Sequence, residues 1–265
     1  MSTLETLRAI WASGRAVING WCTIPGAWGA EIMARAGWDT VTVDLHHGLV
    51  DYRDAVGMFQ AIQLGGAVPL ARAPWNEPGI IMKLLDAGAL GIICPMVNSG
   101  EECARFVGAC RYAPQGYRSY GPTRARPAYG EAYDQSIGPQ VLAFAMVETA
   151  QALNNLDAIA SVPGLSGIYV GPADLSLSLG SPERSDPTVP HVVEAIERVL
   201  SVCKQRGLIA GFHCGSPAYA HHMIARGFQF VTVGSDGAFL AAGAEAAVRA
   251  MRSDVPAAQA STALY

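Results

Sequence analysis

Short apolar segments rich in β-branched residues alternate along the chain with longer segments in which apolar residues recur at helical spacing. The short segments predict eight strands, over Ala16–Trp21, Thr40–Asp44, Val68–Arg72, Gly91–Cys94, Val141–Val147, Gly167–Val170, Leu208–Phe212 and Phe228–Val233. The longer segments predict helices, among them Gly26–Ala36, Tyr52–Leu64, Pro78–Ala87, Ser99–Cys110, Ala152–Ile159, Val189–Arg206 and Pro217–Arg226. Strands that alternate with helices indicate a parallel sheet.

Three of these strands contain the sequences VTVDL, VLAFAMV and FVTVG, which are apolar along nearly their whole length. Such strands are typical of a sheet that is buried on both faces. Eight strand–helix units in a chain of 265 residues favour an α/β fold of the (β/α)₈ TIM-barrel type, with an open doubly wound sheet as the alternative. We predict a single domain over residues 1–256 and a C-terminal tail over residues 257–265.

Composition excludes several classes of protein. The chain is 51% apolar and 15% charged, which argues against a disordered chain. Its net charge of −4 argues against a nucleic-acid partner, because such proteins present a basic face. No apolar stretch approaches the roughly 18 residues of a membrane span, and the first residues do not resemble a signal peptide. The six cysteines form no C-x-x-C pair, which is typical of reduced thiols in a cytoplasmic protein.

Polar side chains stand at the predicted carboxyl ends of several strands, where barrels carry their active sites. They are the segment Asp44-Leu45-His46-His47, Arg72, Glu148, the segment Gly171-Pro172-Ala173-Asp174, and His213. The carboxylates of Glu148 and Asp174 suit Mg²⁺ or Mn²⁺, or could form a general acid–base pair. His47 can act as a base near neutral pH, and Arg72 offers donors to a carboxylate or an enolate oxygen.

A divalent metal, an arginine and a histidine around a small anion suit the enolisation of a 2-oxo acid. An aldolase that works through a Schiff base needs a lysine in its pocket. The chain has only two lysines, Lys83 and Lys204, and both fall within predicted helices. We therefore expect a metal-dependent mechanism without an imine. No G-x-G-x-x-G follows the first strand, so we expect no bound nucleotide.

The segment Arg111–Pro139 interrupts the alternation and is rich in Gly, Pro, Tyr and Arg. We interpret it as an insertion on the face of the barrel that carries the active site. Its arginines are Arg111, Arg118, Arg124 and Arg126. They would meet an anionic substrate or a neighbouring subunit, or else belong to a solvated loop with packed tyrosines.

Five segments resemble motifs of the HpcH/HpaI aldolase family, whose members are metal-dependent pyruvate aldolases of class II. They are VDLHHG, LARAPWNEP, MKLLDAGALGIICPMV, AMVET and GIYVGPADLSLSLG, and the resemblance spans nearly the whole chain. It implies His47 as the proton-transfer residue, Arg72 as the catalytic arginine and Asp86 as the dyad partner of the histidine. It also implies Glu148 and Asp174 as metal ligands. The implied substrate-binding residues are Trp21, Arg72, Gly171, Pro172, Ala173 and Asp174.

The resemblance implies Mg²⁺, Mn²⁺ or Co²⁺ as cofactor, with pyruvate and an aldehyde as substrates. It also implies a homo-oligomer, a hexamer, in which the last helix packs on a neighbouring subunit. Two residues depart from the family pattern: His46 replaces an acidic or amide residue, and Met146 replaces a glutamine. The alternative functions are a lyase that acts on a coenzyme A thioester, as in the citrate-lyase β-subunit group, and a non-catalytic barrel that binds 2-oxo acids.

Overall fold

Eight parallel strands form a closed barrel in the computed structural model, which describes residues 4–252. The strands are β1 (Val17–Cys22), β2 (Thr40–Asp44), β3 (Val68–Arg72), β4 (Gly91–Cys94), β5 (Leu142–Val147), β6 (Gly167–Val170), β7 (Ile209–Cys214) and β8 (Phe230–Val233). All eight predicted strands are confirmed, with boundaries shifted by two residues at most. The first strand pairs with the last, Val17 beside Phe230, which excludes the open sheet.

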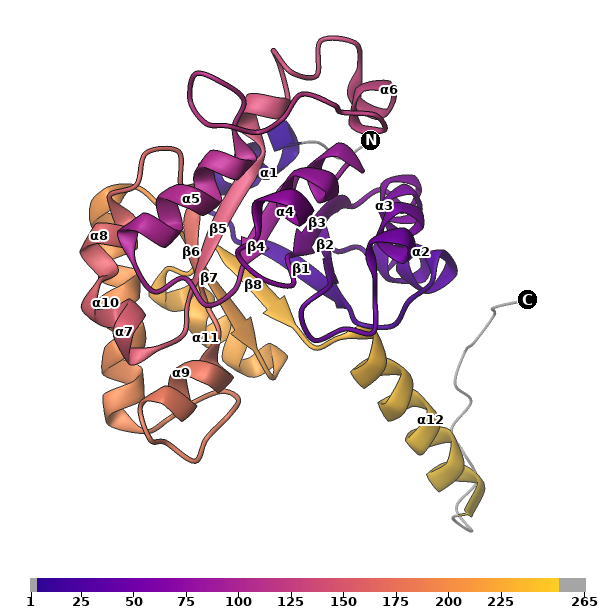
Figure 1. Ribbon diagram of the computed structural model, residues 1–265. Coiled ribbons are helices and arrows are strands. Elements are labelled where there is room, and N and C mark those ends of the chain that lie inside the picture. Colours follow the sequence, from indigo (N-terminus) through magenta and orange to yellow (C-terminus); the bar gives the residue numbers. More distant parts are fainter. Residues whose placement is uncertain (1–3, 253–265) are drawn as a thin grey trace.

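Most of the helices surround the barrel and cover the outer face of its strands, whereas α12 projects from it (Figure 1). The helices are α1 (Leu4–Ala12), α2 (Ala27–Arg35), α3 (Tyr52–Gly65), α4 (Pro78–Asp86), α5 (Gly100–Cys110), α6 (Ala125–Tyr129), η1 (Gly138–Gln140), α7 (Ala150–Asn154), α8 (Leu156–Ala160), α9 (Pro172–Ser178), α10 (Pro190–Arg206), α11 (Pro217–Arg226) and α12 (Asp236–Arg252). The helix predicted over Ala152–Ile159 is in fact two helices. Asn155 ends α7 and begins α8, because its backbone leaves the helical conformation.

Two apolar clusters account for the burial of both faces of the strands. The larger cluster fills the space between the strands and the surrounding helices. The smaller cluster fills the barrel interior with large side chains such as Phe144, Tyr169 and Phe230. Leu4 and Leu7 of α1 belong to this inner cluster, so α1 closes the amino end of the barrel. The strands are apolar throughout because each one packs against both clusters.

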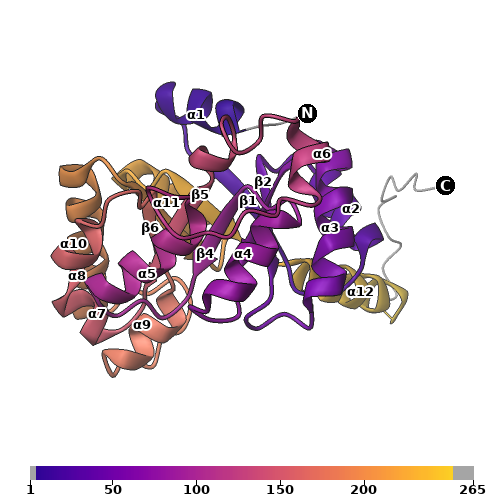
Figure 2. The ribbon, with the colours of Figure 1, turned by 45° about the horizontal axis from the view of Figure 1, so that its top comes forward.

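The segment Arg111–Pro139 lies at the amino end of the barrel, close to α1, and our placement of it on the active-site face is wrong (Figures 1 and 2). It follows α5 and precedes β5, so it is a helix-to-strand connection, and these connections lie opposite the active-site face. Arg124 donates to the carbonyl oxygen of Ala87 at 2.7 Å, and Tyr129 donates to that of Gly88 at 2.7 Å. Both contacts attach the segment to the residues just before β4.

The last described helix, α12, extends away from the barrel (Figure 1). None of its residues is buried, and Leu240 and Met251 are exposed over 66% and 86% of their surfaces. The predicted tail over residues 257–265 lies outside the described residues. Within residues 4–252, no helix is long and apolar enough to cross a membrane.

Candidate active site

A pocket of ≈ 450 Å³ opens at the carboxyl ends of the strands. Eight of the nine residues predicted for the site line it: Trp21, His47, Arg72, Glu148, Gly171, Pro172, Ala173 and Asp174. The pocket is also lined by residues to which the motif analysis gave no role in the site, among them Asp44, Met146, Arg184 and His213. Because each strand contributes side chains from its last residues, positions distant in sequence converge here.

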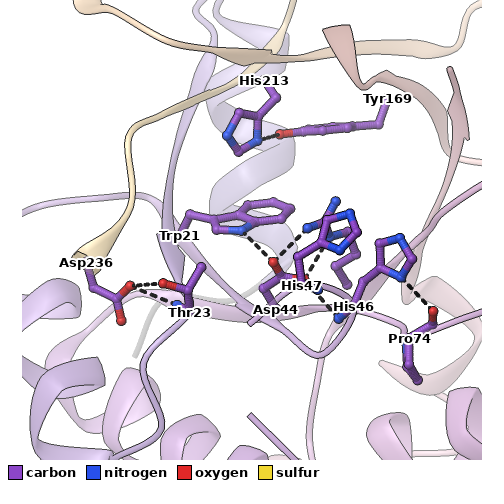
Figure 3. A network of polar contacts seen from close by, with 10 residues as sticks. Trp21, Thr23, Asp44, His46, His47, Pro74, Tyr169, His213 and Asp236 are labelled. Carbon is purple, nitrogen blue, oxygen red and sulfur yellow. Dashed lines mark hydrogen bonds and ion pairs between the residues drawn. The ribbon is translucent and has the colours of Figure 1, made fainter. Parts of the chain in front are cut away.

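Asp44, at the end of β2, holds Arg72 in a fixed orientation. Arg72 Nε donates to one carboxylate oxygen of Asp44 at 2.8 Å, and Arg72 Nη2 donates to the other at 2.7 Å. The indole of Trp21 and the backbone amides of His46 and His47 donate to the same carboxylate (Figure 3). Burial alone would raise the pKa of Asp44, but these bonds and the charge of Arg72 lower it. The aspartate is therefore a permanent anion that positions a cation.

Arg72 keeps part of its guanidinium group available to a ligand. Its plane lies over the indole of Trp21, with Cζ 5.0 Å from the ring centroid. Within residues 4–252, the Nη1 nitrogen has no hydrogen-bond acceptor, whereas Nε and Nη2 are bound to Asp44. A guanidinium that is fixed on one edge and free on the other can donate to an anionic oxygen in the pocket without losing further conformational freedom.

Glu148 is a buried carboxylate just beyond β5 and is only 2% exposed. The backbone amide of Met96 donates to its Oε1 at 2.7 Å. Burial raises the pKa of Glu148 to about 7, the negative charge of Asp174 adds to this rise, and the Met96 bond and Arg72 oppose it. A buried carboxylate whose pKa is raised by a neighbouring negative charge marks a site that favours a cation.

The donor set of this pair fits a small divalent metal ion. Glu148 and Asp174 offer carboxylate oxygens, and the open pocket leaves room for water and substrate oxygens, which Mg²⁺ and Mn²⁺ prefer. In the part of the chain that the structure describes, no group of three or more His, Cys, Asp or Glu side chains is arranged to hold a metal. A metal here would therefore have two protein ligands and complete its coordination with small molecules.

Gly171 creates the space for the Glu148 carboxylate. A Cβ atom built at Gly171 would lie 2.3 Å from Glu148 Oε2 and 2.8 Å from Met146 Cε. We expect Gly171→Ala to displace the carboxylate and to weaken Mn²⁺ binding by about tenfold or more, the usual cost of disturbing a ligand's orientation. Isothermal titration with Mn²⁺ measures the change. Gly29→Ala, in α2 at a position with no atom within 4 Å of a new Cβ and no positive φ, is the control for an added methyl group. Unchanged Mn²⁺ affinity in Gly171→Ala would contradict the expectation.

The two adjacent histidines have different surroundings. His47 lines the pocket and is exposed at its mouth. His46 turns away, and its Nδ1 lies 2.7 Å from the carbonyl oxygen of Pro74 (Figure 3). Burial lowers the pKa of His46, and the Pro74 bond only partly opposes this. The geometry therefore gives His46 a structural role and leaves the imidazole of His47 accessible to a ligand.

Asp86 is the one predicted site residue that does not line the pocket. It is the last residue of α4, and Arg118 Nη2 donates to its Oδ1 at 2.6 Å. The helix ends at the amino side of the barrel, so within this chain Asp86 and His47 lie at opposite ends of the barrel. Its assignment as the partner of the histidine stays a prediction.

The motif analysis missed the role of Asp44 and of Tyr169. The sequence carries a signal for Asp44, because it ends a strand three residues before His47, but a strand-end aspartate alone does not reveal which cation it binds. Tyr169 looks like an interior apolar residue of β6. Its hydroxyl nevertheless lies 3.1 Å from His213 Nδ1 at the pocket floor. Such a contact between two strands follows only from the register of the barrel.

Comparison with known proteins agrees with this geometry. Residues 24–242 match the sequence profile of the family described as HpcH/HpaI aldolase/citrate lyase. The match covers most of the chain. It includes seven of the eight predicted residues in the pocket, and only Trp21 lies before it. The protein therefore belongs to the HpcH/HpaI aldolase/citrate lyase family, whose enzymes are lyases.

Two individual relatives and one solved structure resemble the chain over nearly its whole length. The chain is 42% identical to the hydroxypyruvate/pyruvate aldolase of Rhizorhabdus wittichii over 241 residues, which cover 91% of this chain and 96% of the relative. It is 35% identical to the pyruvate aldolase of Rhizobium etli, over 88% of this chain and 92% of the relative. A crystal structure of an HpcH/HpaI family protein from Burkholderia cenocepacia superposes with a TM-score of 0.86 at 30% identity, over 95% of this chain and 100% of that chain.

Proposed function

We propose that this protein is a divalent-metal-dependent pyruvate aldolase, an aldehyde-lyase. It enolises pyruvate and adds the enolate to an aldehyde, and in reverse it cleaves a 4-hydroxy-2-oxo acid. The observation that carries the proposal is one pocket in which a carboxylate pair, Glu148 and Asp174, lies beside an arginine clamped by a buried aspartate. The names of the relatives from Rhizorhabdus wittichii and Rhizobium etli support pyruvate as the substrate.

Five residues of the pocket have a task in this reaction. Glu148 and Asp174 would hold Mg²⁺, Mn²⁺ or Co²⁺, which would supply Lewis-acid polarisation of the keto group. Arg72 donates a hydrogen bond to the keto oxygen and stabilises the negative charge that develops there. The first turn of α9 directs the amides of Ala173 and Asp174 into the pocket, where they bind the substrate carboxylate.

His47 moves the proton. Acting through a water molecule, its imidazole takes a proton from the methyl carbon of pyruvate, and the electron pair of the broken C–H bond forms the enolate. The enolate carbon then attacks the aldehyde carbon, and the resulting alkoxide oxygen takes the proton back from the histidine. Asp44 stays ionised and takes no part in this exchange, because its bonds to Arg72 lower its pKa.

The lysine positions support a mechanism without an imine. Lys83 packs its ammonium group over the ring of Tyr52, 4.2 Å from the centroid. Lys204 donates to the carbonyl oxygen of Arg226 at 2.8 Å. Neither lysine lines the pocket. Borohydride treatment with pyruvate is therefore expected to leave the protein mass unchanged, because an imine needs an amine beside the keto carbon.

The charge distribution favours an aldolase over a lyase that acts on a coenzyme A thioester. A nucleotide-bearing thioester needs cations near the pocket mouth. The arginines of the segment Arg111–Pro139 lie at the other end of the barrel and have partners there, such as Asp86 for Arg118 and the Ala87 carbonyl for Arg124. Arg184 lines the pocket, but its Nη1 donates to the carbonyl oxygens of Ser181 and Glu183, so it is one cation and not a cluster. A non-catalytic binder of 2-oxo acids, in turn, needs no accessible imidazole such as that of His47.

The test is proton exchange, which needs no knowledge of the aldehyde. Pyruvate is incubated with the protein in D₂O, and the methyl proton signal is followed by nuclear magnetic resonance with Mg²⁺, Mn²⁺ or Co²⁺ and then with EDTA. We expect the signal to decay with added metal and the decay to stop with EDTA, because enolisation precedes carbon–carbon bond formation. Restoring the metal in excess is the control for damage by the chelator. An absence of exchange with every metal would overturn the proposal.

We also propose that the protein is a homo-oligomer, a hexamer, in which α12 packs on a neighbouring subunit. The support is the helix itself, which buries none of its residues and exposes Phe239, Leu240, Val248 and Met251 over 44% or more of their surfaces. A helix of 17 residues that contacts little of its own chain gains its stability from packing elsewhere.

Light scattering tests this arrangement. We expect Leu240→Glu combined with Met251→Glu to lower the solution mass from that of an assembly toward that of one chain, because two carboxylates would enter an apolar contact. Arg206→Glu, a charge change on the exposed end of α10, serves as the control. An assembly that survives the double substitution unchanged would refute the role of α12.

We further propose a cytoplasmic location. All six cysteines are free thiols, and all six are buried. Burial raises the pKa values of these thiols, for example that of Cys103 to about 12 and that of Cys203 to about 12. Unpaired thiols are usual where the surroundings are reducing, as in the cytoplasm.

A further inference from the structure

The connection between β4 and α5 supplies a backbone donor to the Glu148 carboxylate, and one side chain holds that connection in place. The N–H of Met96 donates to Glu148 Oε1 at 2.7 Å. Two residues later, the side-chain amide of Asn98 donates to the carbonyl oxygen of Met96 at 3.0 Å. The Oδ1 atom of the same side chain accepts a hydrogen bond from the hydroxyl of Thr149, the residue that follows Glu148. Asn98 thus links the donor to Glu148 with the backbone that carries Glu148.

The direction of each of these bonds follows from groups that can act in only one way. A backbone carbonyl accepts and never donates, so the NH₂ group of Asn98 faces Met96 and its Oδ1 faces Thr149. Thr149 precedes the first residue of α7, and its Oγ1 accepts from the backbone N–H of Ala152 at 2.9 Å. The proton of the Thr149 hydroxyl is then donated to Asn98. Donors and acceptors therefore match along the whole linkage from Met96 to Thr149.

Met96 has a backbone conformation that needs this support. Its φ is 54°, in the left-handed region that residues with a Cβ atom seldom adopt. Its N–H and its carbonyl lie on either side of the Cα atom, so a contact that fixes the carbonyl also fixes the direction of the N–H. The N–H of Val97, which shares a peptide group with that carbonyl, donates to the carbonyl oxygen of Met146 in β5 at 3.3 Å. Tertiary contacts, and not a helix or a strand, therefore aim the Met96 N–H at Glu148.

We propose that Asn98 is a positioning residue that orients the Glu148 carboxylate for a metal ion. The inference rests on the proposed function, in which Glu148 is a metal ligand, and it adds a residue that the motif analysis did not name. Asn98 does not line the pocket, so it acts through Met96 and Thr149. A carboxylate that is oriented before the ion arrives loses less freedom on binding it, and the affinity for the ion rises accordingly.

Calorimetric titration with Mn²⁺ tests this role. We expect Asn98→Ala to weaken Mn²⁺ binding by about tenfold or more, the usual cost of losing a group that orients a metal ligand. Thr149→Val removes the hydroxyl at the other end of the linkage and should also weaken binding, whereas Thr149→Ser keeps the hydroxyl and should restore the affinity. Asn76→Ala is the matched control, because Asn76 is a half-buried asparagine that donates to the carbonyl oxygen of Glu102 in α5 at 2.9 Å. It should bind Mn²⁺ with the wild-type affinity.

A double substitution separates this role from a general loss of packing. Asn98→Ala and Thr149→Val break the same linkage, so their combined effect on Mn²⁺ affinity should fall well short of the product of the two single effects. A combined effect equal to that product would overturn the linkage. Mn²⁺ binding by Asn98→Ala within about twofold of the wild type would overturn the positioning role itself.

A second measurement uses the protein without metal. The chain has eight methionines, and after labelling with ¹⁵N-methionine the Met96 amide signal is the one that is lost in Met96→Leu. We expect Asn98→Ala, and likewise Thr149→Val, to speed hydrogen exchange of this amide by about tenfold or more, because its bond to Glu148 is no longer held. Unchanged exchange in both variants would overturn the proposal. A wild-type protein that binds no Mn²⁺ would instead refute the proposed function, and the exchange rates would still decide the role of Asn98.

Discussion

Arg72→Ala is expected to lower kcat/KM for aldol cleavage by about a thousandfold, the upper range for removal of a donor to a developing oxyanion. The loss has two causes. The substitution removes the donor that we propose for the keto oxygen. It also leaves the Asp44 carboxylate, 1% exposed, without the cation that binds both its oxygens. An unpaired buried anion next to the reaction centre opposes the formation of an enolate. Steady-state kinetics on the purified variant measure the effect.

Arg72→Lys separates the effect of the positive charge from the effect of the two-oxygen contact with Asp44. The lysine restores a positive charge but cannot bind both oxygens of Asp44, so we expect a loss of about tenfold or more compared with the wild type. Arg35→Ala removes an arginine whose partner is Glu31 on the surface of α2, and it should leave the kinetics unchanged. A kcat/KM for Arg72→Ala within a few-fold of the wild type would remove Arg72 from the mechanism.

His47→Ala is expected to slow deuterium exchange into pyruvate by about a hundredfold or more, the usual contribution of a general base. The affinity for pyruvate should change little, because Arg72 and the carboxylate pair that we propose as metal ligands remain. This combination of lost proton transfer and retained binding is the signature of a base. It is measured by the exchange assay together with a titration of pyruvate into the metal-loaded protein.

His221→Ala, on the exposed surface of α11, is the matched control for loss of an imidazole and should exchange at the wild-type rate. Exchange by His47→Ala at more than a tenth of the wild-type rate would assign the proton transfer to another group. The remaining titratable groups of the pocket are then compared in turn, beginning with Glu148, whose pKa is raised to about 7.

The fold was predictable because the signals that determine it are local and repeated. Each strand is a short apolar run, as in Thr40–Asp44, and several helices end just before a glycine such as Gly207, whose positive φ suits a helix terminus. Alternation of such units leaves few architectures besides a closed barrel. The convergence of Arg72, Glu148 and Asp174 then follows from topology, because the carboxyl ends of parallel strands meet.

The contacts of the site were not predictable to the same degree. That Asp44 binds Arg72, and not a metal, depends on the pairing of β2 with β3, which sets these two residues side by side. The contact between Tyr169 and His213 likewise depends on the pairing of β6 with β7. The segment Arg111–Pro139 was misplaced because its composition resembles an active-site loop. The decisive fact was its position after a predicted helix and before a strand.

Pairing of β1 with β8 has a consequence for the synthesis of the protein. The first strand leaves the ribosome more than two hundred residues before its partner, since Val17 pairs with Phe230. Until then, one edge of β1 has no strand to pair with, and the apolar side chains of α1 have no closed barrel to pack against. Contacts this distant in sequence fold slowly, and unpaired strand edges are prone to aggregation. The newly made amino-terminal half is therefore expected to need a chaperone until β8 emerges, and chains truncated before residue 230 should collect in the insoluble fraction.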